Sequence, residues 1–338
     1  MKIKDNWNFS SKLTARKLIN AFKIYSSYQY SVKTRSAKIH GLPISLSIEP
    51  TTSCNLRCPE CPSGLRSFTR PTGMLSLDTY DQILNELAPT LMYLILYFQG
   101  EPYLNPQFFS MVSGASSKNI YSATSTNGHY LDDENAKNTI TSGLDRLIIS
   151  IDGADQATYE SYRVGGELSK VIEGAKNVVS WKKKLKSRTP HIIFQFLVVK
   201  HNEDQLNEIN KLASAIGVDE VTFKTAQIYD YENGSDLIPT IDKYSRYKKG
   251  KDGKWVLKNK LEDKCWKMWH SSVMTWDGKI VPCCFDKDAA HQMGTVQNQS
   301  FNEIWNGRDY NQFRNSLLHS RKSIDICKNC TEGTKVWT

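Results

Sequence analysis

Short apolar runs alternate with amphipathic stretches along the chain from residue 42 onward. Six of these runs have the length of a buried strand, and helical periodicity separates one run from the next. The strands are expected at residues 42–48, 91–98, 144–151, 191–199 and 218–223, and in a run that ends near Ser125. This alternation predicts a parallel sheet with helices outside it. Six units are too few for a closed eight-fold barrel, so the pattern predicts an open, partial barrel or a doubly wound sheet.

The pattern changes after the sixth strand. Residues 229–264 are rich in Tyr, Lys, Asp and Gly and contain a turn signal at Lys251-Asp252-Gly253, which indicates a linker or lid. From residue 265 onward the chain is rich in Trp and Cys, with short strands expected near 273–282 and a helix at 302–318. Its core is small, so we expect a metal to hold this part together. The expected divisions are an N-terminal extension (1–40), a core (41–228), the linker or lid (229–264) and a C-terminal module (265–338).

The net charge of +9 is concentrated at the N-terminus. Residues 1–40 contain nine Lys and Arg and a single acid, Asp5, so they carry eight of the nine net charges. A body that bound nucleic acid would spread its basic residues over the fold, and we therefore expect no nucleic-acid partner. The chain has no run of 18 apolar residues and no secretory signal, so we expect a cytoplasmic location and no membrane-spanning helix.

Residues 11–30 have the pattern of a basic amphipathic helix. Leu18, Phe22 and Tyr25 recur at helical spacing, with lysines and arginines between them. Two interpretations fit this pattern. The first is a helix that packs its apolar stripe on the body of the protein. The second is a helix that lies on a membrane surface, which would make the protein peripheral to the membrane.

Eight cysteines fall in two groups that are far apart in the sequence. The first group, Cys54, Cys58 and Cys61, has the spacing C-x3-C-x2-C and directly follows the first predicted strand. Active sites of parallel α/β folds form at this end of the strands. Three thiolates so close together can hold three corners of an iron–sulfur cube and leave the fourth iron open. A structural zinc site is the alternative, although zinc usually takes four ligands from two short pairs.

With this motif the sequence resembles the radical S-adenosylmethionine (SAM) superfamily, over about residues 42–226. Members place C-x3-C-x2-C after the first strand of a TIM-like partial (β/α)6 barrel. The resemblance implies that the open iron of a [4Fe–4S] cluster binds SAM, and that the reduced cluster cleaves SAM to methionine and a hydrogen-abstracting 5′-deoxyadenosyl radical. It also implies an external electron donor such as a flavodoxin or ferredoxin. One departure is Glu60, because the family usually has an aromatic residue before the third cysteine.

Three further segments follow the ends of predicted strands in the order that the family has. They are Gln99-Gly100-Glu101-Pro102, which resembles the G-G-E-P motif, then Ser125-Thr126-Asn127-Gly128, and then Ser150-Ile151-Asp152-Gly153 with Arg163 beyond it. The resemblance implies that the Glu101 carboxylate receives the amino group of SAM and that the Arg163 guanidinium binds its carboxylate. The SAM contacts expected in this way are Gly100, Glu101, Pro102, Ser125, Asn127, Ser150, Asp152 and Arg163.

The second cysteine group lies in the C-terminal module. Cys265, the pair Cys283-Cys284 and the C-x2-C pair of Cys327 and Cys330 supply enough thiolates for a closed site with four ligands. A turn at Trp276-Asp277-Gly278-Lys279 is expected to fold a hairpin that carries Cys283 toward the C-x2-C pair. The spacing alone fits structural zinc as well as an iron–sulfur cluster. The module resembles the SPASM or twitch domains of radical SAM enzymes. This resemblance implies one auxiliary [4Fe–4S] cluster on Cys265, Cys283, Cys327 and Cys330, with Cys284 as the alternative to Cys283.

A closed auxiliary cluster suggests a path for an electron that leaves a substrate radical. The cysteine spacing looks most like that of the aminocyclitol dehydrogenases of the superfamily. We therefore expect a two-electron oxidation of a C–H bond in a small polar substrate such as a sugar or aminocyclitol. Peptide modification is the alternative, since many SPASM-bearing relatives perform it. A non-catalytic metal-binding scaffold is the third interpretation, and no catalytic base is indicated by the sequence.

Overall fold

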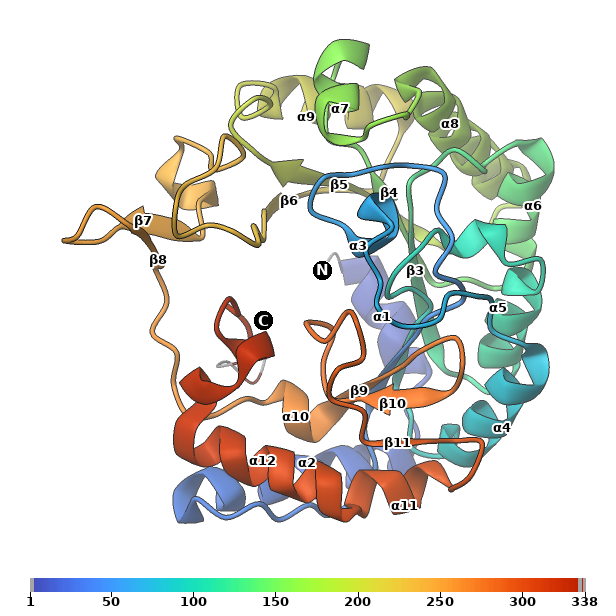
Figure 1. Ribbon diagram of the computed structural model, residues 1–338. Coiled ribbons are helices and arrows are strands. Elements are labelled where there is room, and N and C mark those ends of the chain that lie inside the picture. Colours follow the sequence, from blue (N-terminus) through green and yellow to red (C-terminus); the bar gives the residue numbers. More distant parts are fainter. Residues whose placement is uncertain (1–2, 334–335, 337–338) are drawn as a thin grey trace.

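The core of the computed structural model, which describes residues 3–333 and residue 336, is a nine-stranded sheet. Its order is β11-β10-β9-β1-β2-β3-β4-β5-β6, so the first six strands neighbour one another in chain order. All six run parallel. Figure 1 shows the sheet curving, with helices on its outside. This is the predicted partial barrel and not a doubly wound sheet. The strands are β1 (Ser45–Ile48), β2 (Tyr93–Ile95), β3 (Tyr121–Thr126), β4 (Arg146–Ser150), β5 (His191–Val198) and β6 (Glu220–Thr225).

Helices follow the strands and cover the outer face of the sheet. Ser76 and Asp132 cap two of them, because each side chain accepts a hydrogen bond from a backbone N–H in the first turn. The sequence over 159–183 predicts a largely helical segment with an interruption at Gly165-Gly166. The structure has two helices there, and the break between them includes Gly165, whose φ of 79° is left-handed. The helices of the core are α3 (Pro62–Leu65), α4 (Leu77–Leu87), α5 (Phe108–Ser117), α6 (Asp133–Thr141), α7 (Gln156–Tyr162), α8 (Leu168–Lys184) and α9 (Leu206–Ile216).

The C-terminal module extends the sheet of the core. β9 (Ser271–Met274) pairs in parallel with β1, and β10 (Lys279–Val281) pairs antiparallel with β9 and with β11 (Gly294–Thr295). The hairpin predicted at Asp277-Gly278 is thereby confirmed, and Gly278 has a left-handed φ of 78°. The module also contains α10 (Lys267–His270), α11 (Phe301–Asn306) and α12 (Arg308–Ser320). A single helix was predicted over 302–318, but Gly307, with ψ near 169°, separates α11 from α12.

The same module also contacts the far edge of the barrel. The Asn329 side chain donates to the backbone oxygen of Ile228 (2.7 Å), and the Tyr247 hydroxyl donates to Asn329 (3.0 Å). Ile228 follows β6, whereas β9 lies beside β1. The module therefore bridges the open side of the partial barrel, from its first strand to the segment after its last.

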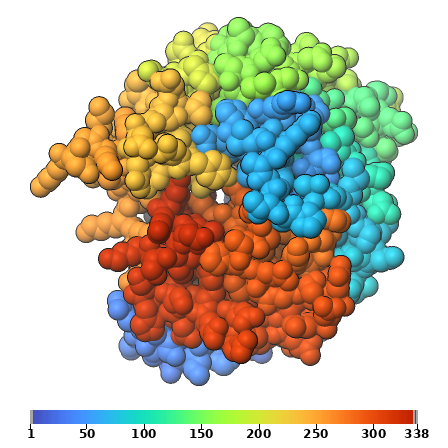
Figure 2. Space-filling model, viewed as in Figure 1, coloured from blue at the N-terminus to red at the C-terminus, as the bar shows by residue number. Residues whose placement is uncertain are grey.

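The segment 229–264 is more ordered than a plain linker. It contains a 3-10 turn at Asp242–Tyr244 and a hairpin of β7 (Tyr247–Lys249) and β8 (Trp255–Leu257). The predicted turn lies at its tip, where Gly253 has a φ of 80°. Figure 2 shows this hairpin projecting from the molecule beside a hollow between the core and the module.

Two N-terminal helices replace the single helix expected over residues 11–30. They are α1 (Ile3–Ser11) and α2 (Ala15–Thr34), and Thr14 caps α2 by accepting from the Lys17 N–H (3.3 Å). α1 packs against the first residues of the core strands, where buried Asp5 pairs with Arg146 and accepts from the Tyr121 hydroxyl. No helix in the described part of the chain is both long and apolar enough to cross a bilayer.

α2 packs on the body as expected, but with a different face. Tyr28 contacts Trp269 of α10 with a ring-centroid distance of 5.4 Å. The stripe of Leu18, Phe22 and Tyr25 points to solvent. The predicted face was wrong because specific polar contacts orient the helix: the Asn20 side chain, for example, bonds both backbone groups of Leu42.

Candidate functional site

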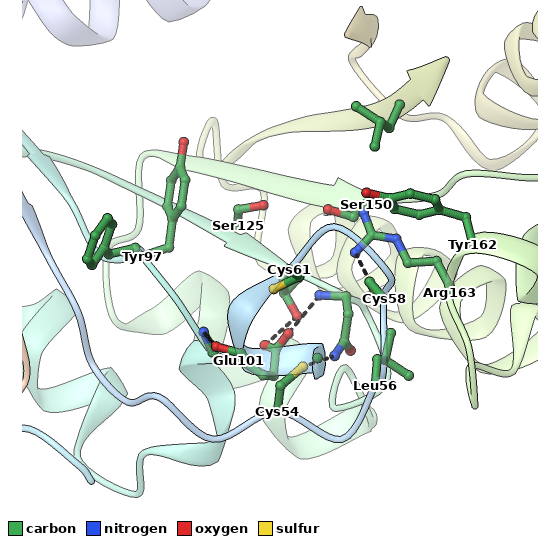
Figure 3. A pocket seen from close by; sticks show the side chains of 17 residues that line it. Cys54, Leu56, Cys58, Cys61, Tyr97, Glu101, Ser125, Ser150, Tyr162 and Arg163 are labelled. Carbon is green, nitrogen blue, oxygen red and sulfur yellow. Dashed lines mark hydrogen bonds between the residues drawn. The ribbon is translucent and has the colours of Figure 1, made fainter. Parts of the chain in front are cut away.

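A cavity of about 170 Å³ lies at the carboxyl ends of the core strands. The loop after β1 bounds it on one side, and residues at the ends of β2, β3 and β4 bound it on the other. Figure 3 shows Cys54, Cys58 and Cys61 on this loop, with Glu101 and Arg163 on opposite sides of Cys61. The structure therefore brings together the first cysteine group and both charged residues predicted to bind SAM.

The cysteine loop is held in a compact shape by backbone contacts. The Cys61 N–H donates to the Cys58 oxygen (3.3 Å), and the Arg57 N–H donates to the oxygen of Val164 (3.0 Å). α3 begins directly after Cys61 with Pro62, whose fixed φ suits the first turn of a helix. A Cβ added to Gly64 would lie 2.6 Å from the Cys58 nitrogen, so a glycine is needed where α3 meets the loop.

Each of the three thiols faces a different segment of the core. The Asn127 amide lies 3.8 Å from the Cys54 sulfur, the Arg163 guanidinium 3.8 Å from the Cys58 sulfur, and the Gln99 side chain 4.0 Å from the Cys61 sulfur. Burial raises the pKa of Cys54 to about 11 and also raises the pKa of Cys58. Buried thiols of this kind lose their protons when a metal centre binds, because the metal compensates the thiolate charge. Three such thiols on one cavity fit a cluster held by three cysteines.

Glu101 is buried in the wall of the cavity. Its carboxylate accepts hydrogen bonds from the Thr126 hydroxyl and from the Asn127 N–H, both at 2.7 Å. Burial raises the pKa of Glu101 to about 7, although these hydrogen bonds oppose the shift. The preceding Gly100 has a φ of 71°, and an added Cβ would lie 2.2 Å from the Thr51 oxygen. Only glycine lets the loop after β2 approach the cysteine loop this closely.

Arg163 extends into the cavity from the end of α7. Its Nε donates to the fully buried carboxylate of Asp152 (2.5 Å), which also accepts from the Leu197 N–H (2.6 Å). Burial disfavours the guanidinium charge, but Asp152 and Cys58 together hold the pKa of Arg163 well above its usual range. The arginine is therefore a fixed cation beside the cysteines.

Six of the eight predicted SAM contacts line the cavity, and two do not. Pro102 begins a 3-10 turn (Pro102–Leu104), and Asp152 lies behind Arg163 and orients it. The strand-end pattern also missed Tyr162 and Leu197, which line the cavity. Leu197 lies near the end of β5, so the same pattern, extended to the fifth strand, would have found it. The six that line the cavity are Gly100, Glu101, Ser125, Asn127, Ser150 and Arg163.

Glu60, the departure from the family motif, does not line the cavity. Its carboxylate accepts from the Tyr229 N–H (3.0 Å), and the Tyr229 hydroxyl accepts from Lys287 (2.9 Å). Glu60 therefore links the cysteine loop to the segment after β6 and, through Tyr229, to the C-terminal module.

In the module, Cys265, Cys327 and Cys330 are buried around the side chain of Arg321. Arg321 is itself buried and donates to the Cys330 sulfur (3.2 Å) and to the backbone oxygens of Lys264 and Glu332. A buried cation among thiols suits a site that becomes anionic when the cysteines ligate a cluster. A Cβ on Gly333 would lie 2.3 Å from the Cys265 sulfur, so the chain passes very close to that cysteine.

The vicinal pair Cys283-Cys284 lies between the cavity of the core and the other three cysteines of the module. Cys284 is 3.9 Å from the Lys267 amine, and after burial it is the main influence raising the pKa of Tyr97, which lines the cavity of the core. Cys283 interacts with Cys265. Cys283 is therefore connected to the other thiols of the module, whereas Cys284 faces the core.

The core matches the family model of the radical SAM superfamily over residues 48–224, more than half of the chain. The chain belongs to the radical SAM superfamily. Residues 265–331 match a second family model, SPASM, described as an iron–sulfur cluster-binding domain. This radical SAM protein is therefore an enzyme that uses a [4Fe–4S] cluster and SAM, and its SPASM domain binds auxiliary iron–sulfur. These matches support iron–sulfur clusters over zinc, and an enzyme over a non-catalytic scaffold.

Two curated relatives cover most of the radical SAM chain. A tungsten-containing aldehyde ferredoxin oxidoreductase cofactor-modifying protein from Pyrococcus furiosus is 26% identical over 85% of this chain and 86% of its own length. The PqqA peptide cyclase of Gluconobacter oxydans is 26% identical over 87% of this chain and 84% of its own. Among solved structures, Streptococcus suis SuiB bound to SAM has the same fold, with a TM-score of 0.64 and 13% identity over 92% of this chain and 77% of its own.

Proposed function

We propose that this radical SAM enzyme modifies a peptide, and that its substrate carries an acidic segment. The similarity to the PqqA peptide cyclase over most of both chains supports a peptide substrate. This reverses the order of the two alternatives that the sequence left open, in which the cysteine spacing favoured a small polar molecule.

The charge of the β7–β8 hairpin supports an acidic segment. Residues 243–260, which we name the basic hairpin, contain eight Lys and Arg and a single acid, Asp252. Lys258 pairs with Asp242 (2.7 Å), but no other lysine of the basic hairpin forms an ion pair within the described residues. Lys248, Lys249, Lys251 and Lys254 are all exposed. The hairpin borders the hollow between core and module in Figure 2, so an acidic peptide bound along it would lie next to that hollow.

At the cavity we propose that Cys54, Cys58 and Cys61 hold the SAM-binding cluster. Glu101 accepts the amino group of SAM, and Arg163, oriented by Asp152, binds its carboxylate. The bound cluster and SAM supply a radical that abstracts hydrogen from the substrate. The burial of Glu101 and Arg163 keeps water from competing for these two charged contacts.

In the SPASM domain we propose that Cys265, Cys283, Cys327 and Cys330 hold one auxiliary [4Fe–4S] cluster. The electrostatic influence of Cys265 on the Cys283 thiol supports Cys283 over Cys284. Arg321 balances the negative charge of the thiolates. Reducing electrons for the first cluster come from a flavodoxin or a ferredoxin.

A two-electron oxidation of a small polar substrate is the second candidate. Its support is the cysteine spacing of the module, which looks most like that of the aminocyclitol dehydrogenases of the superfamily.

One incubation experiment distinguishes the two candidates. The enzyme, reconstituted without oxygen and reduced, is given SAM with either short acidic peptides encoded beside its gene or a panel of sugars and aminocyclitols. With a peptide, and not with a sugar or aminocyclitol, we expect more 5′-deoxyadenosine than SAM cleavage without substrate produces. The mass of the peptide should change as well. Turnover of a sugar or aminocyclitol, without turnover of any peptide, would overturn the proposal.

The role of the basic hairpin is tested with the same assay. Replacing Lys248, Lys249, Lys251 and Lys254 by Gln is expected to raise the KM for the acidic peptide at least about threefold, because rim charges assist the capture of a charged partner. The uncoupled cleavage of SAM should not change. The matched control replaces four exposed lysines of α8 and its C-terminal end, Lys176, Lys183, Lys184 and Lys186, by Gln. An equal rise in KM for both variants would show that the affinity for the peptide depends only on the net charge of the protein and not on the basic hairpin.

A further inference from the structure

α2 exposes most of its large apolar residues and buries several polar ones, although Ile24 and Tyr28 are also buried. Five large apolar or aromatic side chains are exposed and are named here the outer face: Leu18, Ile19, Phe22, Tyr25 and Tyr30. The Tyr25 ring also lies 6.2 Å from the Trp266 ring between centroids. Phe22, at the centre, is 70% exposed, and Ile19 is 57% exposed. Leu18, Phe22 and Tyr25 are spaced by four and three residues, which places them on one side of the helix, and Ile19 lies three residues before Phe22. Ordinary surface helices of globular proteins have the opposite arrangement.

Specific hydrogen bonds hold the helix in this orientation. Lys17 is buried and donates to the backbone oxygens of Lys12 (3.1 Å) and Asn119 (2.6 Å). Asn20 donates to the Leu42 oxygen (2.7 Å) and accepts from the Leu42 N–H (2.9 Å). Rotating α2 to bury the outer face would break these bonds and leave buried polar groups unpaired, which is costly. The outer face therefore stays exposed in the folded chain.

Exposed apolar residues are concentrated in this part of the protein. Of the fourteen large apolar or aromatic residues exposed within the described chain, seven lie between residues 3 and 30. The same region carries most of the positive charge, with nine Lys and Arg against one acid in residues 1–40. Arg16, Lys23 and Lys33 of α2 are exposed beside the outer face. A groove lined by Phe22, Lys23 and Ile39 continues this surface.

We propose that the outer face of α2 docks on the surface of an anionic lipid bilayer. Aromatic and aliphatic side chains bordered by lysine and arginine are the composition of helices that lie in the membrane interface. The positive charge complements anionic headgroups, whereas the outer faces of two copies of this chain would repel each other. A single helix of this kind gives weak, reversible attachment, which suits a peripheral enzyme.

The position of α2 leaves the active site accessible during docking. In Figure 1, α2 lies beside α12 at the edge of the molecule, away from the loop that carries Cys54, Cys58 and Cys61. None of the outer-face residues lines the cavity of the core. Changes to the outer face should therefore alter membrane binding without altering SAM cleavage.

The test measures binding of the full-length protein to vesicles by flotation. We expect at least about tenfold more protein on vesicles of equal phosphatidylcholine and phosphatidylglycerol than on vesicles of phosphatidylcholine alone. Salt at about 0.5 M should weaken the binding, because it screens surface charge. The variant Ile19→Ser/Phe22→Ser should lose at least about tenfold in binding to the anionic vesicles and keep its thermal midpoint. The variant Lys23→Gln/Lys33→Gln should weaken binding to anionic vesicles only.

The matched control removes two exposed apolar residues elsewhere. Leu185→Ser/Val256→Ser should bind anionic vesicles as the wild type does. The proposal would be overturned if the wild-type protein failed to float with anionic vesicles. It would also be overturned if this control lost as much binding as Ile19→Ser/Phe22→Ser. A dimer that forms in solution and is abolished by Phe22→Ser, without binding to vesicles, would assign the outer face to a second copy and also overturn it.

Discussion

Glu101 is the residue whose protonation state decides most directly what the cavity can bind. Its pKa of about 7 means that both forms are populated near neutral pH in the empty cavity. An ammonium group placed against the carboxylate favours the ionised form, so a bound SAM would displace the proton. The raised pKa also makes folding less favourable as the pH rises from about 4.5 to about 7, because the unfolded chain ionises this carboxyl earlier.

We predict that the affinity for SAM falls as the pH is lowered below 7. The decrease should approach about tenfold per pH unit below the pKa of Glu101 and should vanish above about pH 8, since the carboxyl must ionise before it accepts the ammonium. Anaerobic calorimetry of SAM binding to the reconstituted enzyme measures this dependence. Glu101→Gln should bind more weakly at pH 8 and show no decrease of this kind. A flat profile for the wild type, or the same slope in Glu101→Gln, would argue against the role of Glu101.

The polar residues of the cavity were largely predictable from the resemblance to the superfamily, whose motifs follow strand ends that converge on one edge of a parallel sheet. This resemblance placed Glu101, Ser125 and Ser150 at the cavity. It could not tell that Asp152, two residues after Ser150, turns behind Arg163, since the path of a loop beyond its strand decides where a side chain points. Glu60 shows the same limit: it stands where the family usually has an aromatic residue, and the sequence did not indicate that its carboxylate bonds to Tyr229.

At the scale of elements, two loops of the core depend on each other for their shape. The loop after β2 approaches the loop after β1 so closely that Gly100 contacts the backbone of Thr51 and Ser53. The Glu101 N–H also donates to the Ser53 oxygen (2.7 Å). The cysteine loop and the loop after β2 therefore form one structural unit.

We predict that Gly100→Ala disrupts this unit. The added methyl would overlap the Thr51 oxygen at a left-handed φ, so the free energy of unfolding should fall by about 3 kcal/mol or more. The amount of iron that the variant binds after reconstitution should also be lower than in the wild type. Gly114→Ala in α5 is the matched control, because its Cβ has its nearest neighbour at 3.4 Å. This control should be neutral or up to about 1 kcal/mol more stable, as expected for alanine inside a helix. Equal stability of both variants in chemical denaturation would contradict the prediction.

Helices and strands were predicted from periodicity, but their orientation and long-range pairing were not. The sequence pattern predicts helices over residues 77–87 and near 108–117, and these are the bounds of α4 and α5. It assigned the wrong face to α2, since counting apolar residues does not register the hydrogen bonds of Lys17 and Asn20. The pairing of β9 with β1 joins residues far apart in the sequence, and no local pattern indicates such a partner.

At the scale of the molecule, the SPASM domain and the core share an interface next to the cavity. Glu49, after β1, forms a buried ion pair with Arg70 (2.6 Å) and accepts from the N–H of Trp276 in the module (3.2 Å). Tyr97 lies in the cavity and is influenced by Cys284 of the module. The module therefore contacts the core beside the cavity that Cys54, Cys58 and Cys61 line.

Electron paramagnetic resonance of the reduced enzyme tests most directly whether Cys54, Cys58 and Cys61 hold a cluster with an open iron. The wild type, reconstituted without oxygen, should contain about eight irons, as two cubes require, and adding SAM should change its spectrum. Cys58→Ala should contain about four irons, keep the signal of the auxiliary cluster and show no response to SAM. A wild-type spectrum that SAM leaves unchanged, or a response that persists in Cys58→Ala, would contradict the proposed site.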